Sequence, residues 1–143
     1  MMHKMKISAT IIVWLHMFVA VMHGISHVGV NVLPALLDNA FLAIFVFIGP
    51  LVALFVLMNT RLTWLGALLL FLFMLGSFLY GFWNHFLLPG VDNIATISPG
   101  LWQLPFQITA SLLFVLEAAG TAIGIWGLFE TVRAALLHRL PAN

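Results

Sequence analysis

The sequence predicts an all-α membrane protein, a bundle of four transmembrane helices with both termini on the cytoplasmic side. Of its 143 residues, 64% are hydrophobic and 6% are charged, whereas soluble domains have roughly 45–50% and about 25%. Four apolar stretches are each long enough to cross a bilayer, which takes ~20 residues. Because these stretches leave no room for a soluble domain, we expect residues 1–143 to form a single four-helix transmembrane domain.

The first two spans are expected at about residues 7–30 and 40–58. The N-terminus resembles a signal peptide, but its apolar run is too long and has no small-residue cleavage site, so we expect the segment to be retained. The first span should end before Pro34, because proline disfavours helix in the residue before it. The second span has no polar side chain in its interior, which predicts a wall facing lipid, and its Gly49-Pro50 pair predicts a kink.

The third and fourth spans are expected at about residues 62–88 and 106–129. The loop between them, residues 89–105, is rich in proline, glycine and small polar residues, which is typical of turns. In the fourth span, Gly120 and Gly124 are four residues apart, a spacing that lets two membrane helices approach closely.

The basic residues predict the orientation of the bundle. All of them fall on one side of the predicted membrane: Lys4, Lys6, Arg61, Arg133 and Arg139. The two loops on the other side contain Asp38 and Asp92 and no basic residue. Since lysine and arginine accumulate in cytoplasmic loops, this pattern predicts an N-in, C-in protein, which we expect in the cytoplasmic membrane of a prokaryote.

Three histidines form a stripe along the first span. His16, His23 and His27 are spaced at seven and four residues, so at 100° per residue they lie within about 40° of arc. Ionisable groups inside a membrane usually face the bundle interior or a water cavity, and they are functional candidates by default. The alternative is that each neutral imidazole makes a hydrogen bond to a neighbouring helix and serves in packing.

Helix depth suggests which polar residues face this stripe, counting ~1.5 Å per residue from the outer ends of the spans. The count predicts three layers: His27 with Asn84 and His85, His23 with Tyr80, and His16 with Glu117. Glu117 lies mid-span among apolar residues, so its carboxyl group must be neutral, paired or bound to a metal.

The segment after the third span adds Asp92 and Asn93 at the outer mouth of the bundle. One interpretation is that these side chains close over His27 and His85. The other is that they form a turn after Pro89-Gly90, as Asp and Asn commonly do.

Charge and cysteine content exclude several functions. A net charge of +1 with scattered basic residues does not favour nucleic-acid binding. The chain has no cysteine, so it has no disulfide, thiolate-held iron–sulfur cluster or catalytic thiol. Any metal must therefore be held by histidine, carboxylate or amide groups. The motifs of zinc proteases and serine hydrolases are absent from the sequence, and whether the protein is an enzyme stays open.

The leading hypothesis is a redox protein with a histidine-ligated cofactor in the outer half of the bundle. A b-type haem needs two histidines at matched depth on different helices, which His27 and His85 provide. A copper or iron ion would instead gather His23, His27 and His85, with Asp92 or Asn84 in support.

Two alternatives remain. A proton or ion relay would use the buried ladder of His16, His23, His27 and Glu117, because such chains mark proton paths. A structural role would make the chain a small accessory subunit of a membrane complex, or a homo-oligomer, whose polar residues specify helix packing. In every case the lipid bilayer is the expected surrounding.

Overall fold

The structure is a computed structural model that describes residues 2–32 and 36–137. It is all-α over these residues, as predicted, with four helical segments long and apolar enough to cross a membrane. Pro34 and Arg139, which entered the sequence analysis, lie outside the described residues.

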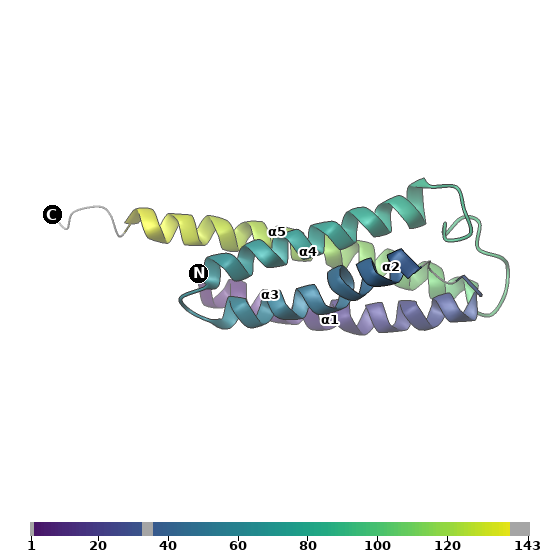
Figure 1. The fold of residues 1–143 in the computed structure, drawn as a ribbon, viewed down its shortest axis with the longest axis horizontal. Helices are drawn as coiled ribbons and strands as arrows, with labels where there is room; N and C mark the ends of the chain where they lie inside the picture. The colour runs from purple at the N-terminus through teal and green to yellow at the C-terminus, as the bar shows by residue number, and fades with distance from the viewer. Residues whose placement is uncertain (1, 33–35, 138–143) are drawn as a thin grey trace.

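The first and last segments are single helices, α1 (Met2–Gly29) and α5 (Gln103–Leu137). The other two are composite. The second runs through α2 (Leu36–Phe41), the π-helix η1 (Leu42–Ile48) and α3 (Gly49–Met58), and the third joins α4 (Thr63–Phe82) to the π-helix η2 (Trp83–Leu87). The segments lie side by side, with the N-terminus and the turn between α3 and α4 at one end (Figure 1).

Two helices are longer than the expected spans. α1 begins at Met2, and α5 continues to Leu137, beyond the expected limit at residue 129. The apolar stretch marks the part of a helix that fits in a bilayer, whereas the helix itself can continue until residues that disfavour helix, such as proline or glycine, end it. The sequences at both ends contain good helix formers such as Lys, Glu, Ala and Leu, so the helices extend past the apolar stretch.

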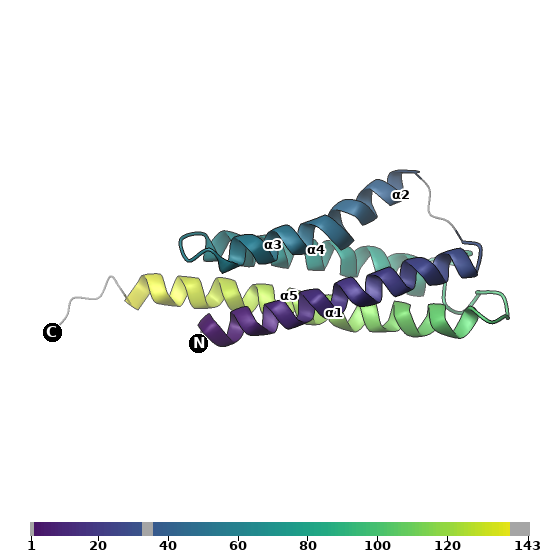
Figure 2. The ribbon, with the colours of Figure 1, turned by 90° about the horizontal axis from the view of Figure 1, so that it is seen from below.

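The second segment bends where the Gly49-Pro50 pair predicts a kink. Pro50 has no backbone N–H, so the α-helical ladder cannot pass through it unchanged. The turn before it is wide, with the Gly49 N–H bonded to the carbonyl of Ile44, and α2 diverges from the line of α3 (Figure 2). The segment is also more than a wall facing lipid, because Val46, Ala53 and Leu57 are buried.

Helices α4 and α5 make the close contact that the small residues predict. A Cβ atom built at Gly124 would lie 2.6 Å from the backbone nitrogen of Phe71, and one at Gly120 would overlap the Met74 side chain. The two backbones therefore approach each other at Gly124 as closely as a glycine permits.

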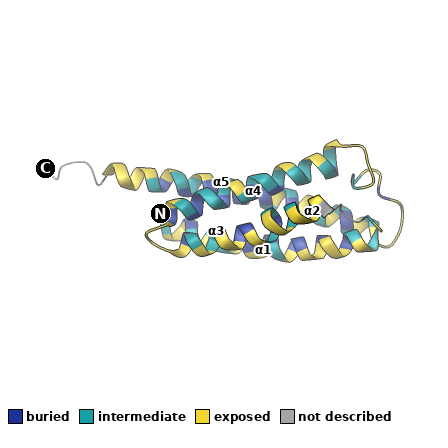
Figure 3. Ribbon diagram, in the orientation of Figure 1, coloured by how far each residue is buried: buried dark blue, intermediate teal, exposed yellow. Residues whose placement is uncertain are grey.

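The interior of the bundle is divided along its length. An apolar core fills the half nearest the N-terminus: Met5, Ala9, Val13, Ala53, Leu57, Ala67, Leu70 and Met74. Buried positions face the neighbouring helices while exposed ones cover the outside (Figure 3). The buried histidines and Glu117 lie further along the helices, in the other half, whereas Thr63 and Glu130 are buried polar residues nearer the N-terminal end.

Candidate metal centre

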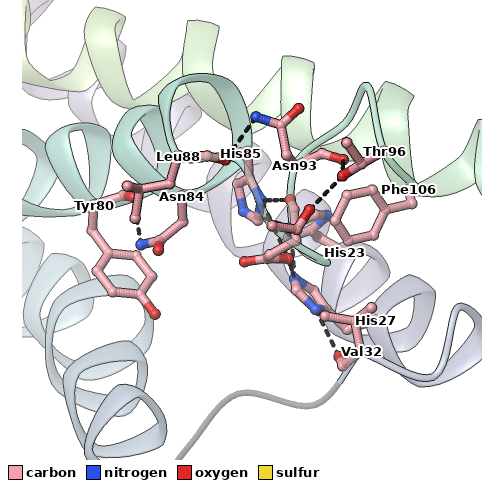
Figure 4. A network of polar contacts seen from close by, with 12 residues as sticks. His23, His27, Val32, Tyr80, Asn84, His85, Leu88, Asn93, Thr96 and Phe106 are labelled. Carbon is pink, nitrogen blue, oxygen red and sulfur yellow. Dashed lines mark hydrogen bonds and ion pairs between the residues drawn. The ribbon is translucent and has the colours of Figure 1, made fainter.

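Three histidines from two segments converge on one point. His23 and His27 lie one turn apart on α1, and His85 lies on η2. The Nε2 atom of His23 lies 3.1 Å from Nε2 of His27 and 3.2 Å from Nε2 of His85. All three rings offer a ligand atom within 4.8 Å of the others, so this trihistidine cluster could hold a metal ion (Figure 4).

The opposite nitrogen of each ring is held by an acceptor. The Nδ1 atoms of His27 and His85 donate to backbone carbonyls, those of Val32 at 3.0 Å and Asp92 at 2.9 Å. Nδ1 of His23 lies 2.9 Å from Oγ1 of Thr109, whose own hydrogen is directed at the Pro105 carbonyl. The hydroxyl oxygen therefore accepts from His23, and all three rings carry their hydrogen on Nδ1.

This tautomer leaves a lone pair on each Nε2. Two such atoms 3.1–3.2 Å apart cannot form a hydrogen bond with each other, because a neutral imidazole has one N–H. For metal–nitrogen bonds of 2.0–2.1 Å, tetrahedral geometry sets ligand atoms about 3.3–3.4 Å apart. The two distances from Nε2 of His23 are close to this value, and the ligand atoms of all three rings lie within 4.8 Å of one another. Ligand histidines are generally oriented by an acceptor at the other nitrogen.

Asp92 closes over the cluster from the loop that follows η2. Its Oδ1 atom lies 3.5 Å from Nε2 of His27 and 3.4 Å from Nδ1 of His85. Neither contact has the geometry of a hydrogen bond, and this buried oxygen has no hydrogen-bond partner among the described residues. A buried carboxylate oxygen without a partner, close to the Nε2 lone pair of His27, fits the donor set of a metal site.

One side of the cluster is sealed by an aromatic ring. Phe106, fully buried at the start of α5, lies with its ring centroid 4.9 Å from those of His23 and His27 and 5.6 Å from that of His85. His23 and His85 are themselves buried, and His27 is partly exposed. Water is thus kept from the Phe106 side.

The loop after η2 is tied to the same histidine that it helps to orient. The His85 ring donates to the carbonyl of Asp92, while the His85 carbonyl accepts the N–H of Ile94 at 3.0 Å. η2 is a π-helical turn, a feature that occurs frequently at functional sites. The third segment therefore ends in a π-helical turn whose residue His85 is hydrogen-bonded to the loop that follows.

A second buried polar pair lies deeper in the bundle. Nε2 of His16 is 3.3 Å from Oε1 of Glu117, and both residues are buried, as the expected layer requires. Nδ1 of His16 is buried and has no partner within the described part of the chain. On the N-terminal side of His16, the buried residues of α1 are Val13, Ala9 and Met5. A ladder of polar groups therefore stops at His16 on this helix.

Other candidate residues lie outside the cluster. The Asn84 amide donates to the carbonyl of Tyr80 at 3.0 Å, and the Tyr80 ring stacks on Phe41 at 4.6 Å. In Figure 4 both side chains point away from the imidazoles. Asn93 has the turn role, since it donates to the Leu88 carbonyl and accepts from the Ala95 N–H.

The layers expected from helix depth are rearranged around His23. His23 was expected beside Tyr80, one layer below His27 and His85, yet its ring contacts both of the other histidines. The count of residues assumed a regular α-helix down to residue 88, and the π-helical turn of η2 changes the depth and direction of His85.

Sequence reasoning missed the groups that orient the rings. Thr109 was not singled out. It lies on the same helix as Glu117 and nearer the outer end, so its depth could have indicated a hydrogen bond to His23. The roles of the Val32 and Asp92 carbonyls could not be predicted from the sequence, because every residue type has a backbone carbonyl.

Comparison of the chain with protein-family models, with curated proteins and with solved structures finds no match. The functional argument therefore rests on the geometry of the site.

Proposed function

We propose that the chain is an integral membrane metalloprotein that binds one redox-active transition-metal ion, copper or iron, through Nε2 of His23, His27 and His85. The observation that carries the proposal is the convergence of three Nε2 lone pairs whose rings are each fixed by an acceptor at Nδ1. A packing role would account for the N–H that His23 directs at Thr109 across the helix interface, but it would not account for the lone pairs that converge at Nε2.

Asp92 is proposed as a fourth ligand. Its Oδ1 atom is near the cluster and lacks a hydrogen-bond partner among the described residues. Imidazole with carboxylate suits iron, copper and zinc, so the donor set alone does not choose the metal. A carboxylate ligand at Asp92 would offset part of the charge of a divalent ion at membrane depth, where a net charge is costly.

The geometry favours an ion over a b-type haem. The cavity beside the histidines has a volume of about 90 Å³, whereas pockets for drug-sized ligands and cofactors take roughly 300–1,000 Å³. The ring of His23 also lies against both His27 and His85, in the space that a macrocycle between them would need.

The proposed orientation has the apolar half of the bundle toward the cytoplasm and the metal centre in the outer half. Lys6 of α1 reaches the carbonyl of Met58 at the end of α3, so the basic N-terminus and the turn that carries Arg61 lie at the same end of the bundle. Such an end is the one retained in the cytoplasm.

The test is metal analysis of the full chain in detergent, purified without chelator and then incubated with copper, iron or zinc. We expect stoichiometric metal in wild type and in the control His3→Ala, which alters an exposed histidine of α1. His23→Ala, His27→Ala and His85→Ala should each lower the affinity by more than about 100-fold, since each removes a ligand outright.

A wild-type protein that stays metal-free under all three incubations would refute the metal centre and leave the accessory-subunit hypothesis. Binding of zinc but neither copper nor iron would keep the centre and remove the redox role.

A further inference from the structure

The trihistidine cluster has a closed side and an open side. Phe106 covers one side, and it does not line the cavity that adjoins the histidines on the other. That cavity, here called the chamber, is bounded by all three histidines, Asp92 and Glu117. A metal held by the three Nε2 atoms and Asp92 would thus have four protein ligands, and a fifth ligand would approach it from the chamber.

Each ligand helix has a small residue one turn inward from its ligand, and these residues make room for the chamber. Ala20 and Gly24 precede His23 and His27 on α1, and Gly81 precedes His85. A Cβ at Gly81 would lie 3.6 Å from Oε2 of Glu117 and 3.8 Å from Cδ2 of His85. The inner wall, formed by Glu117, is therefore close to the metal ligands.

The remaining walls are mostly apolar, with Ser77 and Tyr80 as the polar exceptions, and they come from η1, α4, η2 and α5. They include the following side chains: Leu42, Val46, Phe47, Phe86, Leu113 and Phe114. The chamber of about 90 Å³ has room for roughly three molecules of the size of water, which each occupy about 30 Å³ in the liquid. Both size and lining fit a very small, weakly polar guest.

The chamber reaches the outside of α1 at Gly24. Gly24 is exposed, and a Cβ atom built there would meet nothing within 4 Å. This position is five residues inside the end of α1, which corresponds to ~7–8 Å along the helix. In a membrane the opening faces lipid, where charged molecules are excluded and uncharged ones dissolve.

We propose that the chamber admits an uncharged molecule of diatomic-gas size from the lipid and delivers it to the metal, where it binds as a fifth ligand. The proposal rests on the metal centre proposed above and adds the class of molecule that reaches it.

The probe is nitric oxide, added without oxygen to the full chain loaded with ferrous iron in lipid nanodiscs. The electron paramagnetic resonance signal of a ferrous nitrosyl reports binding to the iron directly, and iron content is measured on the same sample. We expect a nitrosyl on the iron of the wild-type protein.

Two variants fill the chamber. Ala20→Leu adds an isopropyl group from a buried position on its wall, and Gly81→Ala adds a methyl group between Glu117 and His85. The control, Ala43→Leu, makes the same change as the first at an exposed position of η1 that does not line the chamber. Because close-packed interiors leave no alternative space, we expect nitric oxide to bind about tenfold more slowly in the filled variants, with unchanged iron content.

The outcomes separate the two proposals. Failure of the wild-type chain to retain iron would refute the iron centre, and the ligand proposal with it. Full iron content without a nitrosyl would overturn the ligand proposal alone. Wild-type binding rates in an iron-loaded Ala20→Leu or Gly81→Ala protein would likewise overturn it, since the gas would then reach the metal by another route. If Ala20→Leu does not fold, the milder Gly81→Ala gives the answer.

Discussion

The Nε2 atoms of His23 and His27 lie 3.1 Å apart, and the hydrogen of each ring is already donated elsewhere, to Thr109 and to the carbonyl of Val32. Two lone pairs at this distance repel unless a cation lies between them. The contact therefore favours the proposed metal site over ordinary packing. The groups that orient the rings can be tested in the same way as the rings themselves.

Thr109 is the acceptor that fixes the central ring. Thr109→Val removes the hydroxyl while keeping the shape of the side chain, so the His23 tautomer and orientation lose their support. Loss of such a partner typically lowers metal affinity about 10–100-fold, and we expect a fall in this range by chelator competition. The matched control is Thr121→Val on the same helix, where the hydroxyl bonds only to the carbonyl of Glu117. Equal losses in both variants would contradict the prediction.

Metal binding should weaken in acid. Protons compete with the metal for the Nε2 lone pairs, and an unperturbed imidazole takes up its proton near pH ~6.5. Below the pH at which the rings titrate, the affinity should fall by up to about tenfold per pH unit for each histidine ligand, and above it the affinity should level off. Asp92→Asn should bind more weakly at every pH but with the same slope in this range. A pH-independent affinity would contradict ligation by these histidines.

His16 and Glu117 should be coupled energetically. Glu117→Leu leaves the fully buried His16 ring without its partner, and an unsatisfied buried polar group costs about 1–3 kcal/mol. The double variant His16→Leu with Glu117→Leu removes both polar groups, so its loss of unfolding free energy should be smaller than the sum of the single losses. Reversible unfolding in mixed micelles measures all four proteins, and additive losses would show that the two side chains act independently.

Two glycines provide a matched test of the packing. Gly124→Ala places a methyl group against the backbone of Phe71, which cannot move aside cheaply, and overpacking of this kind costs about 1–3 kcal/mol. Gly24→Ala meets nothing within 4 Å and should stay within about 1 kcal/mol of wild type, since alanine is the better helix former. Thermal unfolding of the two variants checks the difference. A neutral Gly124→Ala would mean that α4 and α5 are not in such close contact.

The orientation can be checked with introduced cysteines, because the chain has none of its own. Thr60→Cys lies in the exposed turn between α3 and α4, and Ser98→Cys lies in the exposed loop before α5. In intact cells, a membrane-impermeant maleimide should label the second variant and leave the first unlabelled until the membrane is opened. The reverse pattern would place the metal centre on the cytoplasmic side.

The sequence was sufficient for the helices because apolarity and length determine what can span a bilayer. The stripe of His16, His23 and His27 followed from helical periodicity alone, and the pairing of His16 with Glu117 followed from depth. These inferences hold wherever the helix is regular, since each depends on a fixed rise and rotation per residue.

The arrangement around His85 could not be predicted in the same way. The π-helical turn Trp83–Leu87 breaks the regular count, so depth misplaced His85 relative to His23. The loop conformation that brings Asp92 over the rings depends on hydrogen bonds such as that from Ile94 to the His85 carbonyl. Neither feature has a periodic signature, and the sequence favoured the turn over the closing role of Asp92.

The separation of the ligands along the chain gives the proposed metal centre a place in the biogenesis of the protein. His23 and His27 emerge with the first helix, but His85 follows 62 positions after His23, and Asp92 follows it on the loop that His85 itself secures. An ion could not acquire its full set of ligands until the third helix had been inserted and its loop had settled. Metal retention would then report that the bundle has been assembled with the correct neighbours.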